Sequence, residues 1–382
     1  MNETYPIHNS LKDADGIGQK RQRVTRRRSF LHGIGVAGAT LMARNLAADS
    51  PTKLSSGDVA ILKFLAAAEI IESDLWTQYS ELGGVEGGNP AYMAALQNLD
   101  ADMSQYISDN TDDELSHAAF LNAYLVSKGE QPVSLDQFRN LPSSQATGAQ
   151  QKGRLTNLMK LDVDTSFYTR YRSDANPDFG ATFPQAVNIR NQPAIPLNDT
   201  DTPPQMDQPI PPETKTAKRM QAIANSASFH FGFIEQGGSS LYPTLALQVS
   251  NVEVLKILLS IGGVEIDHFG LWHDKMGNAV SQPLAGVTDP ETGTTFPDLN
   301  DPANQVNGAE LSQTNLILPE PCRFLVPDVP CSIIRPMSTA NSGAVATINA
   351  FIADNLFLYQ SGAFIELLMQ MANAADSAKR NV

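Results

Sequence analysis

The sequence predicts an all-α protein built around four long helices, and two observations carry this prediction. Four stretches of the 382-residue chain place apolar residues three and four positions apart, the spacing that puts side chains on one face of a helix. In each stretch the same face also contains an acidic residue, which a purely structural helix would leave on its solvent side. The four helices are therefore expected to pack together around buried acidic groups.

The first two helices are bounded by glycine. The first is expected over residues 57–82, before Gly83 and Gly84, and the second over residues 101–128, before Gly129. Glycine is common just past the end of a helix because it tolerates conformations that other residues avoid. The inward-facing residues are Leu62, Leu65, Glu69, Glu72, Trp76 and Tyr79 in the first helix, and Met103, Tyr106, Asn110, Glu114, His117, Leu121 and Tyr124 in the second.

The third helix is expected over residues 216–247 and the fourth over residues 251–276. Gly237, Gly238 and Pro243 lie inside the third stretch, and they predict a kink there because proline removes one helical hydrogen bond. The inward-facing residues are Ser228, Phe231, Glu235, Gly238, Tyr242 and Leu245 in the third helix, and Val254, Leu258, Ile261, Glu265, His268 and Trp272 in the fourth.

These elements divide the chain into three parts. Residues 1–48 precede the helices, and residues 57–276 form the four-helix bundle with a long insertion at 130–215. The proline-rich insertion either covers the site as a lid or serves as an assembly interface, since loops of this length usually pack over a face or carry function. Residues 277–382 form an extension that begins with an irregular proline-rich segment and ends in an apolar helix over 343–379.

The N-terminal part resembles an export peptide. Arg27 and Arg28 precede a glycine-rich apolar run over residues 33–43, which small residues follow, and the run is too short for a convincing transmembrane helix. A paired arginine followed by Phe-Leu resembles the twin-arginine export signal. The sequence therefore predicts a periplasmic or extracellular protein without a membrane anchor in its mature form; a basic tail is the alternative.

The charge balance argues against nucleic acid as a partner. The chain carries a formal charge of −14, and without residues 1–48 it retains 19 basic and 38 acidic side chains, a net charge of −19. A surface this acidic repels phosphates and anionic lipids. The two cysteines, Cys322 and Cys331, lie in the proline-rich segment and either form a disulfide after export or stay as free thiols.

Two Glu-x-x-His motifs are the most specific feature of the sequence. Glu114 and His117 form the first, on the second helix, and Glu265 and His268 form the second, on the fourth helix. Residues three positions apart share a helix face, so each motif directs a carboxylate and an imidazole to one point. A buried glutamate without a partner is costly, and a bound metal ion is the simplest way to compensate it.

The other two helices each supply a carboxylate. Glu69 lies on the first helix and Glu235 on the third, and an aromatic residue follows each after seven positions. Together with the two motifs, this indicates two copies of a helix pair related by an approximate two-fold axis. That symmetry would place two metal ions side by side, with Glu114 and Glu265 in bridging positions. Glu72 is the alternative ligand on the first helix, although its counterpart in the third helix is Gly238.

The donor types favour iron or manganese. The predicted ligands are Glu69, Glu114, His117, Glu235, Glu265 and His268, and none is a thiolate. Imidazole and carboxylate together suit iron and manganese better than zinc. One Glu from each of two helices and Glu-x-x-His from two others is the general pattern of ferritin-like dimetal sites. The sequence thus predicts two Fe ions, or an Fe/Mn pair, per chain.

Other polar and aromatic residues are expected to play supporting parts. Trp76, Tyr79, Tyr124 and Tyr242 are interpreted mainly as core residues, with a hydrogen-bonding or redox role near the metals as the alternative. His230 and His273 are off the ligand faces and are expected at the surface or at caps. Asp267 points away from its neighbours in the motif and is expected to be solvated or to support a ligand.

The segment from Ile61 to Glu72, with the two Glu-x-x-His motifs, resembles the ferritin-like family that includes desiccation-related proteins. The resemblance covers residues 57–128 and 216–276, and it implies a ferritin-like four-helix bundle with a dimetal centre. It implies either an oxidoreductase that uses O2 or peroxide, with an unknown substrate, or a stress-protective protein with a structural metal or none. An oligomer fits both readings, but the insertion and the extension argue against a ferritin-type cage.

Overall fold

The computed structural model describes the chain from residue 53 onward, with gaps. The described residues are 53–170, 184–201, 215–304, 320–322, 326–331 and 339–381. The predicted export peptide, residues 1–48, lies outside them. None of the helices in the described part is long and apolar enough to cross a membrane.

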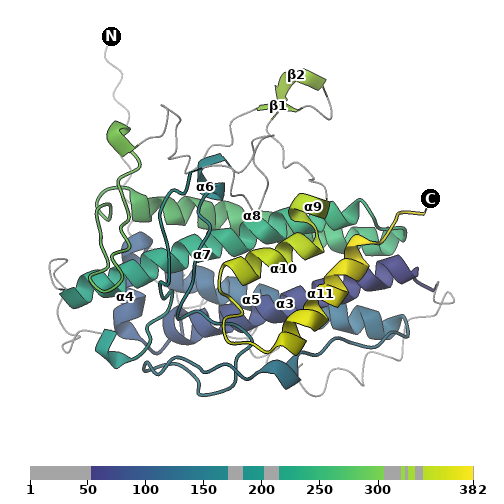
Figure 1. Ribbon diagram of the computed structural model, residues 1–382, viewed down its shortest axis with the longest axis horizontal. Coiled ribbons are helices and arrows are strands. Elements are labelled where there is room, and N and C mark those ends of the chain that lie inside the picture. Colours follow the sequence, from purple (N-terminus) through teal and green to yellow (C-terminus); the bar gives the residue numbers. More distant parts are fainter. Residues whose placement is uncertain are drawn as a thin grey trace, which may run out of the picture. The chain divides into compact units, whose positions relative to one another are not determined.

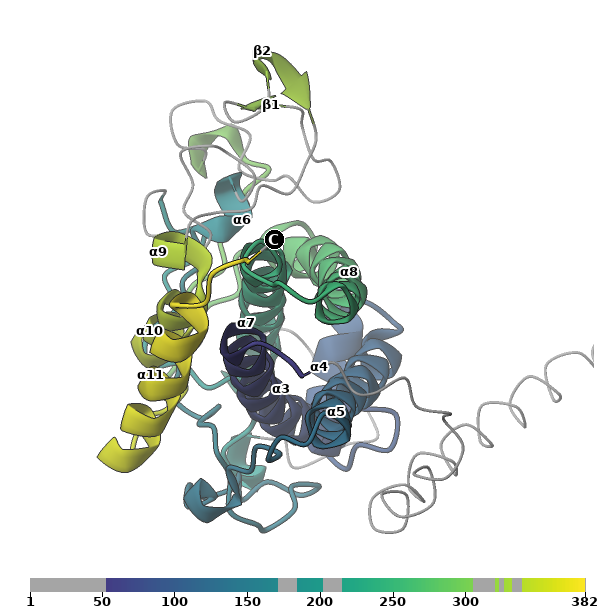
Figure 2. The same cartoon turned by 90° about the vertical axis from the view of Figure 1, so that its right-hand side faces the viewer.

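Four long helices form the centre of the fold, and Figure 2 shows them nearly end-on. They are α3 (Ser56–Gly83), α5 (Met103–Ser127), α7 (Lys215–Ala246) and α8 (Val252–Gly277). Helix α3 packs against α5, and α7 packs against α8. The prediction of an all-α four-helix bundle is confirmed, and every boundary lies within two residues of the predicted one. The predicted breakers in the third helix do not end it, because α7 continues through Pro243.

The two helices of each pair run antiparallel. In the first pair, Ser73 donates a hydrogen bond to the main-chain oxygen of Glu114, and Thr111 donates one to that of Trp76, both at 3.1 Å. Residue numbers therefore rise along α3 while they fall along α5. Only residues 247–251 join α7 to α8, and a connection this short requires antiparallel neighbours. The bundle thus consists of two antiparallel helix pairs, while the two-fold relation between them stays a prediction.

Helix α4 (Pro90–Leu99) was not expected from the sequence. It begins with a proline, and the Asn89 side chain accepts a hydrogen bond from the Tyr92 N–H, which caps the helix start. It packs against α7, and also contacts α3 and α5. With only ten residues, it is too short for apolar spacing to repeat over several turns.

The prediction of one C-terminal helix over residues 343–379 was wrong. The segment forms α9 (Thr339–Ser342), α10 (Ala344–Ala353) and α11 (Gly362–Asp376). Between α10 and α11, Asn355 and Tyr359 adopt positive φ angles of 63° and 72°, which a continuous helix does not allow. Helix α11 packs on α3 and α10 packs on α7, so the extension covers one side of the bundle (Figures 1 and 2).

A short antiparallel hairpin precedes this region. Strand β1 (Glu320–Cys322) pairs with β2 (Val326–Cys331), with Glu320 opposite Cys331. Both cysteines lie in the hairpin, but their side chains are outside the described part of the structure, so the disulfide stays a prediction.

Buried side chains of α3, Asp74 above all, anchor the insertion to the bundle, and Glu81 adds an ion pair with the buried Arg154. Asp74 of α3 accepts hydrogen bonds from the main-chain N–H groups of Leu155 and Thr156, both at 3.0 Å, and from the Thr156 hydroxyl at 2.7 Å. Arg139 adds an ion pair at 2.6 Å. The described part of the insertion also contains the 3-10 turns η2 (Asp136–Phe138) and η3 (Asp199–Asp201) and the single turn α6 (Phe167–Arg170).

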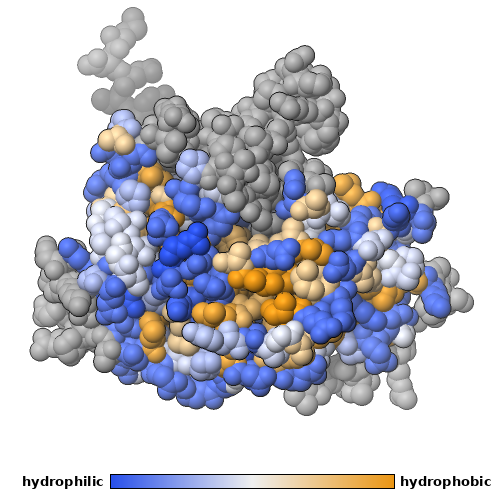
Figure 3. All heavy atoms as spheres, viewed as in Figure 1, coloured by the Kyte–Doolittle hydropathy of each residue, from blue (hydrophilic) through white to orange (hydrophobic). Residues whose placement is uncertain are grey.

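Apolar residues gather near the middle of the face shown in Figure 3, over the area where α10 and α11 lie in Figure 1. These two helices contribute partly buried hydrophobic residues that pack on the core, among them Val345, Ile365, Leu367 and Met369. The extension therefore completes the hydrophobic core beside α3 and α7.

Candidate metal centre

All six predicted ligand residues lie in the interior of the bundle and face one another. Helices α3 and α7 each contribute one glutamate, and α5 and α8 each contribute a glutamate and a histidine. Two groups of possible ligand atoms result, each with all its atoms within 4.8 Å of one another. The first contains Glu69, Glu114, His117 and Glu265, and the second contains Glu114, Glu235, Glu265 and His268. The role of these six as metal ligands stays a prediction.

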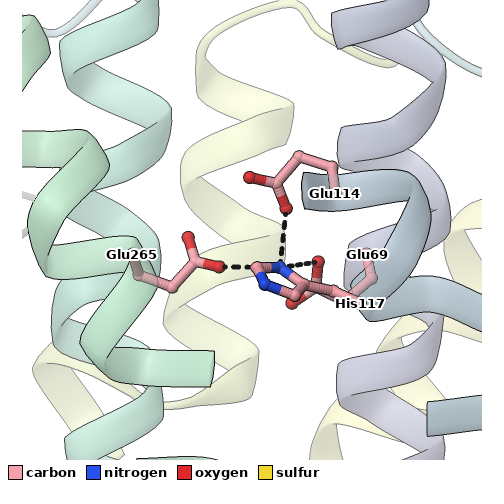
Figure 4. A group of neighbouring side chains, drawn as sticks. All are labelled: Glu69, Glu114, His117 and Glu265. Carbon is pink, nitrogen blue, oxygen red and sulfur yellow. Dashed lines mark hydrogen bonds and ion pairs between the residues drawn. The ribbon is translucent and has the colours of Figure 1, made fainter. Parts of the chain in front are cut away.

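In the first group, three carboxylates converge on one imidazole nitrogen (Figure 4). The Nδ1 atom of His117 lies 3.2 Å from Glu114 Oε2, and 3.4 Å from both Glu69 Oε2 and Glu265 Oε1. One nitrogen carries at most one proton, so it can donate to only one of the three oxygens at a time. The arrangement therefore collects more acceptors than the protein's own donors can satisfy.

The second group repeats this pattern around His268. Its Nδ1 atom lies 3.2 Å from Glu114 Oε1 and 3.3 Å from Glu235 Oε2. On the opposite side of the ring, Nε2 lies 3.1 Å from Asp113 Oδ2, which can accept its proton and so leave Nδ1 free as a ligand. The sequence analysis missed Asp113, although it directly precedes the first motif.

Glu114 and Glu265 are the two residues that belong to both groups. Each has two carboxylate oxygens, and the two oxygens of Glu114 point to different histidines. A carboxylate placed between two cation positions can bind both. This placement is the one expected for bridging residues in a two-fold arrangement. Glu72, the alternative ligand on the first helix, belongs to neither group among the residues described.

The charges of the cluster influence one another strongly. Burial and, after it, the negative charges of Glu235 and Glu69 raise the pKa of Glu114 to about 7, against the opposing effect of hydrogen bonds with the two histidines. Burial also raises the pKa of Glu265 and Glu72 well above the usual range, with further contributions from the neighbouring carboxylates. The metal-free cluster therefore holds protons at neutral pH that a bound cation would displace.

Burial acts on the pKa values of the two histidines in the direction opposite to its effect on the glutamates. Burial alone would lower the pKa of His117, but the nearby carboxylates of Glu114, Glu265 and Glu69 raise that pKa well above its ordinary value. The pKa of His268 is likewise raised against burial, chiefly by the charge of Glu235 and by hydrogen bonds. In the metal-free protein the two imidazolium groups thus supply the positive charge that metal ions would otherwise supply.

Two further observations show that the donor set fits metal ions. Glu69 Oε2 and both carboxylate oxygens of Glu265 are buried without a hydrogen-bond partner. Each such oxygen is costly unless something binds it. The backbone also leaves room for these groups, since a Cβ atom added to Gly238 would lie 2.5 Å from Glu265 Oε2. A glycine on the inward face of α7 is therefore needed where Glu265 approaches.

Neighbouring side chains hold the outer glutamates. Asn110 donates from Nδ2 to Glu114 Oε1 at 2.9 Å and to Glu235 Oε1 at 3.1 Å, and its Oδ1 accepts from Trp272 Nε1 at 2.6 Å. The Tyr242 hydroxyl donates a short hydrogen bond to Glu69 Oε1. The sequence analysis placed Asn110 on the inward face without giving it a role, whereas it allowed Tyr242 a hydrogen bond near the metals.

The expectation that His230 and His273 lie at the surface was wrong. Both are buried, because aromatic side chains or polar partners surround them. His273 packs between Tyr168 and Phe269, with ring centroids 5.1 and 5.5 Å away. Asp267 is exposed, as the solvated reading predicted. Tyr124 is only partly buried, and its hydroxyl donates to Glu253 at 2.9 Å.

Comparison with known proteins agrees with this geometry. The chain matches the family of the ferritin-like domain over residues 57–278, which is more than half of its length and contains all six cluster residues. Searches of curated proteins and of solved structures gave no match. The four-helix bundle, the buried carboxylate and histidine groups and the extent of the match lead to one conclusion: the chain belongs to the ferritin-like domain family.

Proposed function

We propose that the protein is a dimetal oxidoreductase that binds two iron ions, or one iron and one manganese ion, and reacts with O2 or peroxide. The observation that carries the proposal is the pair of overlapping ligand groups that share Glu114 and Glu265. Four carboxylates and two imidazoles match the preference of iron and manganese for oxygen and nitrogen donors. Bound as a pair, these metals would supply the redox chemistry needed for a reaction with O2 or peroxide.

The chain's own residues have distinct parts in this proposal. Glu69 and His117 would hold one ion, Glu235 and His268 the other, and Glu114 and Glu265 both. Glu114 and Glu265 are fully buried. Bulk water is therefore excluded from their surroundings, and their charges interact in a medium of low dielectric constant.

Three hydrogen bonds set the orientation of the ligands. Tyr242 fixes the carboxylate of Glu69, Asn110 fixes that of Glu235, and Asp113 directs the ring of His268. Such supporting contacts tune both the affinity for a metal and its reactivity. They also keep each carboxylate in one orientation until a cation takes the place of its proton.

Oxygen uptake tests the proposal. Purified protein is loaded with Fe(II) without air and then mixed with oxygenated buffer, while an oxygen electrode records consumption. We expect fast uptake in a fixed ratio to the bound iron, and background uptake in the double variant Glu114→Gln/Glu265→Gln. Equal uptake by both proteins would contradict the proposal. A folded protein that binds no metal would favour the stress-protective scaffold to which the desiccation-related resemblance points.

We further propose that the protein is exported by the twin-arginine route and acts in the periplasm or outside the cell. The support is the Arg27-Arg28 pair ahead of the apolar run. Replacing both arginines by lysine should cause the precursor to accumulate inside the cell, as seen by fractionation and immunoblotting. Undiminished export of that variant would contradict the route.

A further inference from the structure

A second line of buried polar residues lies outside the metal cluster. The Tyr79 hydroxyl lies 2.7 Å from His230 Nδ1, and His230 Nε2 lies 3.0 Å from Asp354 Oδ2. All three side chains are at most 1% exposed. They come from α3, from α7 and from the residue that follows α10. With Nε2–H donating to the Asp354 carboxylate, Nδ1 is free to accept the proton of Tyr79.

Asp354, at one end of this line of residues, also lines a cavity. The cavity has a volume of about 200 Å³, and Val163, Phe233, Ala350 and Ala353 form much of its apolar wall. Asp354 also lines it, and its Oδ1 atom is buried without a hydrogen-bond partner. Burial raises the pKa of this carboxyl to about 6, a shift that the contact with His230 opposes. The other lining residues pair with one another, Arg190 with Asp162 and Gln185 with Asp164. The cavity therefore combines an apolar wall, paired polar side chains and one unused acceptor.

Aromatic rings connect the other end of the line with the metal cluster. The centroids of Tyr79 and Trp76 are 5.7 Å apart, and those of Trp76 and Trp272 are 5.4 Å apart in a stacked arrangement. Trp272 donates to Asn110, whose amide in turn contacts Glu114 and Glu235. Tyrosine and tryptophan are the side chains most readily oxidised by one electron, and here they form an unbroken row of neighbours.

Ordinary core packing explains why the two tryptophans are buried, but it does not explain why His230 and Asp354 are. A core gains nothing by burying a carboxylate with one unsatisfied oxygen, because that oxygen loses its water and receives no replacement. The aspartate also faces a cavity large enough for a small ring. A ligand with an apolar ring and one hydroxyl donor would fill the apolar walls and satisfy Oδ1.

We propose that the cavity at Asp354 binds a small phenol-type electron donor, and that Tyr79, Trp76 and Trp272 pass its electron toward the metal cluster while His230 and Asp354 move its proton. The electron transfer rests on the proposed function, since the oxidant it consumes is the metal pair in its oxidised form. The binding site itself does not depend on that function, because every residue that forms it lies outside the cluster.

The relay balances in two stages. In the first, Tyr79 loses one electron through Trp76, its hydroxyl proton moves to His230 Nδ1, and the proton of His230 Nε2 moves to Asp354. In the second, the bound phenol gives one electron to the oxidised Tyr79. The stored protons return along the same line to Tyr79, and the phenol proton passes to Asp354 and then to solvent. The net change is the loss of one electron and one proton by the phenol.

Binding is tested first, on the metal-free full-length protein, with 4-methoxyphenol as the probe and calorimetry as the readout. Saturable one-site binding is expected. Ala350→Leu should abolish it by filling the cavity, and Asp354→Asn should weaken it at least ten-fold by removing the free acceptor. Ala346→Leu, one turn away on α10 and outside the cavity lining, is the matched control and should bind normally. Absence of binding, or binding that is unchanged by Ala350→Leu, would overturn the proposal.

Electron transfer is tested second, on metal-loaded and oxidised protein, by following a single turnover of 4-methoxyphenol. Tyr79→Phe keeps the ring and removes the hydroxyl, so the dissociation constant should stay unchanged while the oxidation rate falls at least ten-fold. Tyr92→Phe is the control, because Tyr92 is equally buried but its hydroxyl donates to the main chain of Ala194. A rate unchanged by Tyr79→Phe would refute the relay. A chain that takes up no metal would refute the proposed function and the relay with it, while the binding assay would still decide the ligand site.

Discussion

The two halves of the metal cluster contain the same ligand types but differ in the residues that support them. In the half formed by Glu69 and His117, the support is a buried tyrosine, Tyr242. In the half formed by Glu235 and His268, it is an amide and a half-exposed carboxylate, Asn110 and Asp113. An approximate two-fold relation therefore holds for the ligands but not for the residues that contact them. The two proposed metal positions should differ in affinity, and substitutions can disturb them separately.

The same contrast appears at the positions that correspond in the helix repeat. Glu72 in α3 corresponds to Gly238 in α7, three residues after Glu69 and Glu235 respectively. Gly238 leaves room for the Glu265 carboxylate, whereas Glu72 adds a fifth buried acid whose pKa is strongly raised. One half thus provides space for a shared ligand and the other provides a proton-holding group.

Of the substitutions considered, Gly238→Ala should have the largest effect on metal binding. The new methyl group would lie 2.5 Å from Glu265 Oε2 and displace a carboxylate that both ligand groups share. We expect the affinity for both metals to fall at least ten-fold, measured by metal titration. Gly270→Ala is the control, because nothing lies within 4 Å of the added atom. It should keep the metals and gain about 0.5–1 kcal/mol of stability from better helix propensity. Normal metal binding by Gly238→Ala would contradict the role assigned to this glycine.

Tyr242→Phe should weaken only one half. It removes the hydrogen bond to Glu69, and losses of supporting contacts of this kind typically reduce metal affinity about 10- to 100-fold. In a two-site titration the ion near His117 should bind more weakly, and the ion near His268 should change little. An equal loss at both sites would show that the halves are not separable.

Changing the pH should act on the cluster as a whole. The pKa values of Glu114, Glu265, His117 and His268 are all raised in the folded metal-free protein. The folded state then holds protons that the unfolded state has lost, so the stability of the metal-free protein should fall as the pH rises from about 4.5 through 7. Metal ions displace these protons, and their affinity should therefore increase over the same range.

Thermal unfolding with and without metal, between pH 5 and pH 8, measures this effect. The increase in melting temperature caused by the metal should be larger at pH 8 than at pH 5. An increase that is independent of pH would mean that the bound ions do not replace protons in the cluster.

Asp113→Asn should have the smallest effect. The Asp113 side chain is 52% exposed, so solvent screens its contact with His268. We expect a loss of about two- to five-fold in affinity for the ion near His268, well below the effect of Tyr242→Phe. A loss as large as that of Tyr242→Phe would show that exposure does not separate the two kinds of support.

The helices and the six cluster residues could be predicted because their information is local. Apolar spacing defines each helix, and the spacing of Glu114 and His117 alone places both on one face. The supporting residues depend on partners that are distant in the sequence. His230 lies 124 residues from Asp354, so no local pattern shows that it is buried and paired. The break after α10 is also hard to see: Asn355 tolerates a positive φ angle, but Tyr359 rarely adopts one and does so here within the folded extension.

The insertion shows the same limit. Its proline content predicts irregular structure but not its attachment, which depends on buried carboxylates of α3: Asp74, bound to Leu155 and Thr156, and Glu81, bound to Arg154. The sequence does not reveal whether an aspartate beside the inward helix face binds a metal or a loop. Here it binds a loop, although it lies only five residues after Glu69 on the same helix.

Metal content tests the central claim most directly. The protein is purified from its native compartment, and elemental analysis compares it with the double variant Glu114→Ala/Glu265→Ala, which removes both shared carboxylates. The account predicts about two iron or manganese ions per chain in the unmodified protein, and their loss from a variant that stays folded by circular dichroism. A folded, unmodified protein that contains no metal and takes up none on reconstitution with iron would contradict it.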